Sequence, residues 1–164
     1  MSQQAPGKGV GRIFMIVAWC AGLYLATQFF GRWEQRQQNP NTEVTSQQGE
    51  GYIEVKLLGN VQGHFVASGR INNVPVEFLL DTGATDVAVP MDLARQLALP
   101  KGVPVTLNTA NGRTQGYQTR IDRLQLGAIV LRDVRAVAAP GLDGEQVLLG
   151  MSALNKLEFT QRGG

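Results

Sequence analysis

From Tyr52 onward, the sequence predicts an all-β domain, either a barrel or a sandwich, with one short helix. Short segments rich in Val, Ile, Leu and Thr alternate with Gly, Asn and Pro, which is typical of strands separated by tight turns. Only Met91–Ala98 has a convincing helical pattern: it follows Pro90 and places Leu93 and Leu97 on one face. An apolar segment ahead of this domain predicts a transmembrane helix.

The apolar segment is Ile13–Phe30, 18 residues without a charge between Arg12 and Arg32. This length suits a helix that crosses a bilayer. A cleaved signal peptide is the alternative, but no small-x-small pair follows the apolar run. We therefore expect a retained single-pass helix over residues 13–30, with residues 1–12 as an N-terminal tail.

The flanking charges balance, with Lys8 and Arg12 on one side and Arg32 and Arg36 on the other. Because a tail this short usually stays in the cytosol, we expect a cytoplasmic N-terminus and a domain on the periplasmic side of the inner (cell) membrane. Residues 31–50 follow, and from Gln35 they are polar with no helical apolar period. We interpret them as a flexible tether to a domain at residues 51–164.

The first strands of that domain are expected at Tyr52–Leu58, His64–Ile71 and Val74–Leu80. Asn72 and Asn73, between the second and third strands, suit a two-residue turn with positive φ. Further on, Asn111-Gly112 is the strongest hairpin signal in the chain. The remaining elements are expected as strands at Val105–Ala110, Arg113–Ile121, Leu124–Leu131 and Val134–Ala139, a loop at Pro140–Gly144, a buried segment at Gln146–Leu149, a helical turn at Ser152–Leu154 and a last strand at Leu157–Thr160.

Composition excludes several classes of function. The net charge is only +2 and the charges are interspersed, so no nucleic-acid-binding surface is indicated. Cys20, the single cysteine, lies in the apolar segment, which leaves the domain without a disulfide or a thiol nucleophile. His64 is the only histidine and makes a poor metal site, so we expect no metal and no cofactor. There is no G-x-S-x-G motif of a serine hydrolase.

One acidic residue stands out by its position. Asp81 ends the apolar run Phe78-Leu79-Leu80 and begins Asp81-Thr82-Gly83. Taken alone, this tripeptide is better explained as a turn, since turn chemistry accounts for all three residues. Two carboxylates brought within about 3 Å of one another, however, share a proton, so that one acts as a base while the other acts as an acid. Asp81 is therefore a candidate for half of a catalytic pair.

Three motifs occur in order: FLLDTGAT, TANGRTQG and VLLGMSAL. As a set they resemble the retropepsin-like aspartic proteases, and among these the single-pass, membrane-anchored bacterial members. This resemblance covers roughly residues 52–159. It implies a closed acid-protease barrel and an aspartic-type endopeptidase that acts on proteins or peptides.

The resemblance also implies roles for individual residues. Asp81 would be catalytic, and Gly150 would back the site beside the catalytic turn. The turn would be shaped by Thr82 and Gly83, and substrate would be bound by Ala84, Thr85, Asp86 and the flap tip Ala110, Asn111 and Gly112.

The chain holds a single Asp-Thr/Ser-Gly, so a catalytic pair requires a homodimer with a two-fold axis between the Asp81 side chains. Many viral members have an Arg after the hydrophobic-Gly element that pairs with an Asp near the catalytic turn. Met151 and Thr85 occupy these places here. This departure keeps open an alternative function, a binding module that holds a peptide in the same cleft without cutting it.

Overall fold

A computed structural model describes residues 8–109, 112–142 and 146–161. It divides the chain into two compact units, Met1–Gln37 and Gln38–Gly164, which are described separately. The boundary falls at the last turn of the N-terminal helix, well before Gly51.

The first unit consists of helix α1 (Lys8–Gln38). Its segment Gly11–Gln38 has a mean hydropathy of 1.8 in its most apolar window, and that window is fully exposed in the structure. The helix is thus long and apolar enough to span a membrane, a property that N-terminal signal sequences share. It continues eight residues beyond Phe30, where the predicted apolar span ends.

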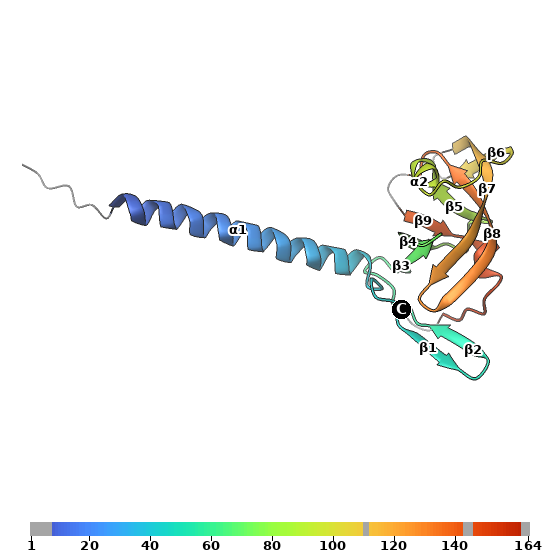
Figure 1. Ribbon diagram of the computed structural model, residues 1–164, viewed down its shortest axis with the longest axis horizontal. Helices are drawn as coiled ribbons and strands as arrows, with labels where there is room; N and C mark the ends of the chain where they lie inside the picture. Colours follow the sequence, from blue (N-terminus) through green and yellow to red (C-terminus); the bar gives the residue numbers. More distant parts are fainter. Residues whose placement is uncertain (1–7, 110–111, 143–145, 162–164) are drawn as a thin grey trace, which may run out of the picture. The chain divides into compact units, whose positions relative to one another are not determined.

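The second unit is mostly β, as predicted. Its main sheet has the strand order β3-β4-β9-β5-β8-β7-β6, and β3 also pairs with β7. This last pairing closes the sheet into a barrel, with β6 attached to β7 outside the closed ring (Figure 1). The elements are β1 (Ser46–Gly49), β2 (Tyr52–Val55), β3 (Val66–Ile71), β4 (Val74–Leu80), β5 (Val87–Pro90), α2 (Met91–Gln96), β6 (Pro104–Thr109), β7 (Gly112–Leu126), β8 (Ile129–Ala139), β9 (Gln146–Leu149) and α3 (Met151–Leu154).

The core lies inside this barrel and is built from alternate residues of its strands. Phe78 on β4 and Val147 on β9 are completely buried, and they lie side by side as partners in the parallel β4–β9 register. Every residue of β5 is buried. The barrel therefore gives β4 and β9 a rigid, apolar support up to their carboxyl ends.

Several predicted elements are confirmed. Strand β4 has the predicted bounds, and the predicted buried segment Gln146–Leu149 is strand β9. Asn72 and Asn73 both have positive φ, 47° and 71°, as the predicted two-residue turn between β3 and β4 requires. The short helix is also confirmed as α2, although it ends at Gln96 and Ala98 takes a left-handed φ of 49°.

Other boundaries were predicted wrongly. The expected strand Leu124–Leu131 is in fact a hairpin, because Gly127 has a φ of 56° and turns the chain between β7 and β8. These two strands form long antiparallel arms (Figure 1). The expected strand Leu157–Thr160 lies after α3 and has no strand pairing within the described part of the chain.

The segment expected to be a tether, residues 31–50, also differs from the prediction. Asn39 and Asn41 are 2% and 5% exposed. The Asn41 side chain donates to the carbonyls of Leu58 (2.9 Å) and Val66 (2.7 Å) and accepts from the Leu58 N–H (2.7 Å). The prediction failed because it assumed that polar residues stay exposed. An amide side chain can be buried when its N–H and oxygen are hydrogen-bonded to backbone groups, as a neighbouring strand would be.

Residues 31–38 of that segment are the end of α1, and residues 46–49 form β1 of the β1–β2 hairpin, which packs on the turn between β7 and β8. The Ser46 hydroxyl accepts a hydrogen bond from the Ala128 N–H at 2.9 Å. A Cβ on Gly127 would lie within 3.2 Å of side-chain atoms of Ser46, Val44 and Val55. The ordered second unit therefore begins at Gln38.

Candidate active site

Asp81 is positioned by two parallel strands that end together. Strands β4 and β9 are paired from Glu77↔Gln146 to Leu80↔Leu149. The Asp81 N–H continues this ladder by donating to the Leu149 carbonyl at 3.2 Å. The Asp81 carboxylate thus lies at the carboxyl ends of β4 and β9, where the apolar strand residues end and a turn begins.

The turn supports the carboxylate of Asp81 directly. The Gly83 N–H donates to Asp81 Oδ1 at 2.8 Å, and the Ala84 N–H donates to the Asp81 carbonyl at 3.3 Å. A Cβ on Gly83 would lie 3.1 Å from Asp81 Oδ1, so the absence of a side chain permits this close approach. A hydrogen bond of this kind stabilises the charged form of a carboxyl group.

The side chains of this turn differ in exposure. Asp81 is half-buried, whereas Thr82 and Gly83 are exposed in the single chain. The catalytic candidate therefore stands at the surface of one copy with its supporting turn open to solvent.

Gly150 lies behind the post-turn loop, which we define as residues 84–87. A Cβ on Gly150 would come within 2.3 Å of the Asp86 carbonyl oxygen and 2.7 Å of the Ala84 carbonyl oxygen. Only glycine permits this contact, because both atoms belong to the backbone. The chain then enters α3, where the Met151 N–H donates to the Ala84 carbonyl at 2.8 Å and the Ser152 N–H donates to the Thr85 carbonyl at 2.9 Å.

The predicted substrate-binding residues Ala84, Thr85 and Asp86 follow the turn directly. Thr85 is exposed, but the Asp86 carboxylate is paired: Arg135 Nε on β8 donates to its Oδ1 at 2.6 Å. Sequence reasoning missed Arg135, which lies in a stretch of mixed charges typical of a solvated face. The structure thus forms an ion pair between Asp86 and Arg135, one residue after Thr85. Thr85 and Met151 themselves carry no charge.

The predicted flap corresponds to the β6–β7 hairpin, paired from Pro104↔Tyr117 to Thr109↔Gly112. Gly112 begins β7 with a φ of 107°, which favours glycine. Ala110 and Asn111, predicted at the flap tip, lie outside the described residues. Their proposed contact with substrate stays a prediction.

Perturbed pKa values occur on the outer surface of the β7–β8 arms. The Arg120 guanidinium hydrogen-bonds to the Asp133 carboxylate, and this bond lowers the pKa of Asp133 below its usual range. The same bond raises the pKa of Arg120. Both side chains are exposed, so the pair is a surface ion pair of small energetic weight.

Comparison with known proteins gives a consistent result. The family model for gag-polyprotein putative aspartyl proteases matches residues 67–156, which include the Asp81–Gly83 turn, the β6–β7 hairpin and Gly150. Among solved structures, a retropepsin-like aspartic protease from Rickettsia conorii is similar, with a TM-score of 0.55, 26% sequence identity, and coverage of 65% of this chain and 90% of that chain.

Two curated relatives carry no described function. An uncharacterized Sinorhizobium protein is 35% identical over 115 residues, covering 68% of this chain and 49% of its own length. An uncharacterized protein of Rickettsia prowazekii is 29% identical over 108 residues, covering 64% of this chain and 46% of its own length. The chain therefore spans about half the length of the curated relatives it matches.

Proposed function

Because this chain belongs to the gag-polyprotein putative aspartyl protease family, of retropepsin-like fold, we propose that it is an aspartic endopeptidase that acts as a membrane-anchored homodimer. The observation that carries the proposal is the position of Asp81. It ends β4 beside β9, accepts the Gly83 N–H at 2.8 Å and is followed by a loop that Gly150 backs. This arrangement holds one carboxylate in place at the surface of each copy.

In the proposed mechanism, two Asp81 carboxyl groups share one proton across the two-fold axis. The unprotonated carboxylate takes a proton from a water molecule while the water oxygen attacks the peptide carbonyl carbon. The protonated carboxyl of the second copy donates its proton to the carbonyl oxygen. The C–N bond then breaks as the first carboxyl group gives its proton to the amine nitrogen and the second takes a proton from a hydroxyl of the tetrahedral intermediate, which restores the shared proton. Loss of the shared proton at higher pH stops the cycle, so the optimum should lie on the acid side.

The homodimer follows from the chemistry and the sequence. The mechanism needs two carboxyl groups in equivalent turns, and the 164-residue chain contains one Asp-Thr/Ser-Gly. In the single copy, Thr82 and Gly83 are exposed next to Asp81. A second copy related by two-fold symmetry would cover this turn and supply the missing carboxyl group.

The test compares the full-length chain with Asp81→Asn in detergent, using a peptide library and several pH values. Asp81→Asn removes both carboxyl groups of the proposed homodimer, so cleavage should fall by at least about 100-fold. In an equal mixture of wild type and Asp81→Asn that has exchanged subunits, about one quarter of the dimers are wild-type homodimers. If only these cut, the mixture should have about one quarter of the activity of wild type at the same total protein concentration. Equal cleavage by wild type and variant would refute the endopeptidase, and a peptide bound but left intact would favour the binding module.

We place the enzyme domain on the periplasmic side of the membrane. Support for the membrane helix itself comes from the length and hydropathy of Gly11–Gln38 in α1. A reporter that matures only in the periplasm, fused after Gly164, should therefore be active. Activity of a cytosol-specific reporter at the same position would contradict this orientation.

A further inference from the structure

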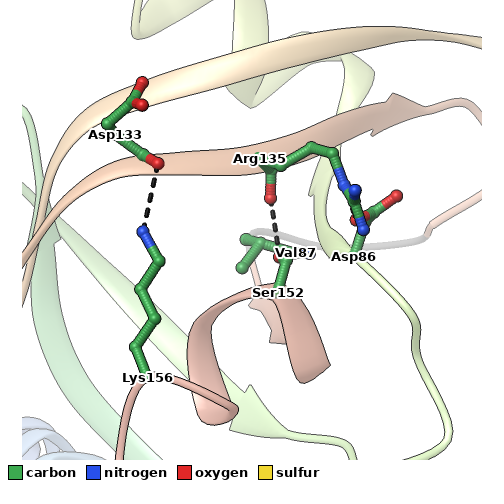
Figure 2. Close-up of polar contacts among 6 residues, drawn as sticks. All are labelled: Asp86, Val87, Asp133, Arg135, Ser152 and Lys156. Carbon is green, nitrogen blue, oxygen red and sulfur yellow. Dashed lines mark hydrogen bonds and ion pairs between the residues drawn. The ribbon is translucent and has the colours of Figure 1, made fainter.

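The Ser152 hydroxyl joins the post-turn loop to strand β8. It accepts a hydrogen bond from the Val87 N–H at 3.0 Å and donates one to the Arg135 carbonyl at 2.7 Å. Figure 2 shows Ser152 on α3 lying between Val87 and the backbone of Arg135. A hydroxyl carries one donor and can accept as well, so Ser152 satisfies one group on each side at once.

Arg135 holds the same loop a second time through its side chain. Its Nε donates to Asp86 Oδ1 at 2.6 Å, a charge-assisted hydrogen bond. The Asp86 side chain is 22% exposed and the Arg135 side chain 58%, so the acidic partner is the more enclosed of the two. Figure 2 shows the guanidinium of Arg135 beside the Asp86 carboxylate.

The loop held in this way leads directly back to Asp81. Its first residue, Ala84, donates its N–H to the Asp81 carbonyl at 3.3 Å. The neighbouring Gly83 N–H supports the Asp81 carboxylate at 2.8 Å. A displacement of the post-turn loop therefore moves the donor that orients the carboxylate.

A further contact fixes α3 to the same strand. Lys156 Nζ, just after α3, donates to the Arg132 carbonyl at 3.0 Å on β8. It also donates to the Asp133 carbonyl at 3.1 Å, the contact drawn in Figure 2. With Ser152 at its start and Lys156 after its end, α3 is attached to β8 at two points. The helix and strand thus form one support for the loop.

We infer that Ser152 and Arg135 are positioning residues for the catalytic turn, which they act on through the post-turn loop. The inference rests on the proposed function for its kinetic consequence. Two Asp81 carboxyl groups must meet at hydrogen-bonding distance across the dimer axis, and small errors in placement have large effects on rate. Loss of the Ser152 hydroxyl or of the Arg135 side chain should therefore lower kcat more than it changes KM.

The kinetic test uses the full-length chain in detergent and matched variants. Ser152→Ala removes the bridging hydroxyl, whereas Ser152→Thr retains it. Thr119→Val is the control, because the Thr119 hydroxyl likewise donates to a backbone carbonyl, that of Pro100 at 2.7 Å, away from the loop. We expect Ser152→Ala to lower kcat about 10-fold with KM within about 2-fold, and both Ser152→Thr and Thr119→Val to stay near wild type.

A second pair of variants tests the side chain of Arg135. Arg135→Gln removes its charge, and Arg120→Gln removes a charge of the same kind from the exposed pair with Asp133. We expect kcat to fall only for Arg135→Gln. This pair also serves if Ser152→Ala does not fold. Equal kcat in wild type, Ser152→Ala and Arg135→Gln would overturn the inference.

Amide hydrogen exchange gives a measurement that needs no substrate. In Ser152→Ala and Arg135→Gln, the amides of Gly83 and Ala84 should exchange at least about 10-fold faster than in wild type, with no change in Thr119→Val. Unchanged exchange would refute the positioning role. If wild type and Asp81→Asn both fail to cleave any peptide, the proposed function fails, while the exchange rates still decide whether Ser152 and Arg135 hold the turn.

Discussion

The catalytic turn and the β6–β7 hairpin are held in opposite ways. The turn and the loop after it are bonded to β9, α3 and β8, with contacts from Leu149, Ser152 and Arg135. The hairpin, in contrast, pairs with itself: from Gly116 to Arg113, the strand pairing of β7 within the described residues is with β6. One region is fixed by several elements and the other by a single ladder.

This difference matches what an aspartic protease would require of the two regions. A catalytic carboxyl must be held close to its partner, whereas a hairpin that covers a peptide must let it enter and leave. An isolated two-stranded hairpin is marginally stable in water, so its opening is inexpensive. The comparison predicts that equal substitutions have unequal costs in the two regions.

The largest expected difference is between Leu149→Ala and Leu107→Ala. Leu149 is 1% exposed and its carbonyl receives the Asp81 N–H, whereas Leu107 on β6 is only half-buried. We expect Leu149→Ala to reduce the free energy of unfolding by about 3 kcal/mol and Leu107→Ala by about 1 kcal/mol. Chemical denaturation of the two variants measures both values. Equal losses would break the comparison.

A substitution with a smaller expected effect, Gly116→Ala, tests where the β6–β7 hairpin leaves the barrel. A Cβ on Gly116 would lie 2.2 Å from the Ala138 carbonyl oxygen and 2.9 Å from Leu107 Cδ1. The hairpin crosses closely over β8 at this point, just before it leaves the barrel. Gly116→Ala should cost about 2 kcal/mol, because the hairpin must lift from Ala138.

The measurement for Gly116→Ala is again chemical denaturation, with peptide cleavage as a second readout. Gly31→Ala is a suitable control, because a Cβ on Gly31 meets nothing within 4 Å. A loss below about 0.5 kcal/mol, the range of ordinary surface changes, would show that the hairpin is free from a point nearer the barrel.

Local signals predicted the framework of the site well. Strands β4 and β9 are short apolar runs bounded by turn residues, and the bounds of both segments were predicted from the sequence. The Asn72-Asn73 turn follows from the tolerance of Asn for positive φ. These features depend on neighbouring residues in the chain, which a single sequence contains in full.

Predictions failed where one signal was ambiguous. In Leu124–Leu131, a mostly apolar stretch concealed the hairpin turn at Gly127, because a single glycine with apolar neighbours does not mark a turn clearly. Strand β5 was not predicted either, although its residues are mostly β-branched or small and all are buried. Its four residues are too few to show a period.

The supporting residues of the site could not be predicted for another reason. Arg135 and Asp86 are 49 residues apart, and Ser152 and Val87 are 65 apart. Such contacts depend on how the barrel closes, and nothing in the local sequence distinguishes Arg135 from a solvated arginine. Asp81 itself was selected as a candidate because three motifs occur in order along the chain.

The burial of Asn39 and Asn41 has a practical consequence for preparing a fragment of this protein without its helix. Sequence alone suggests starting at Gly51, in front of the first expected strand. Such a fragment would lack the amide that bonds to Leu58 and Val66, as well as the Asn39 side chain that donates to Ser68 and Glu77. A fragment meant to retain the native barrel should therefore begin no later than Gln38, and one begun at Gly51 would open a gap along β3 that water must fill.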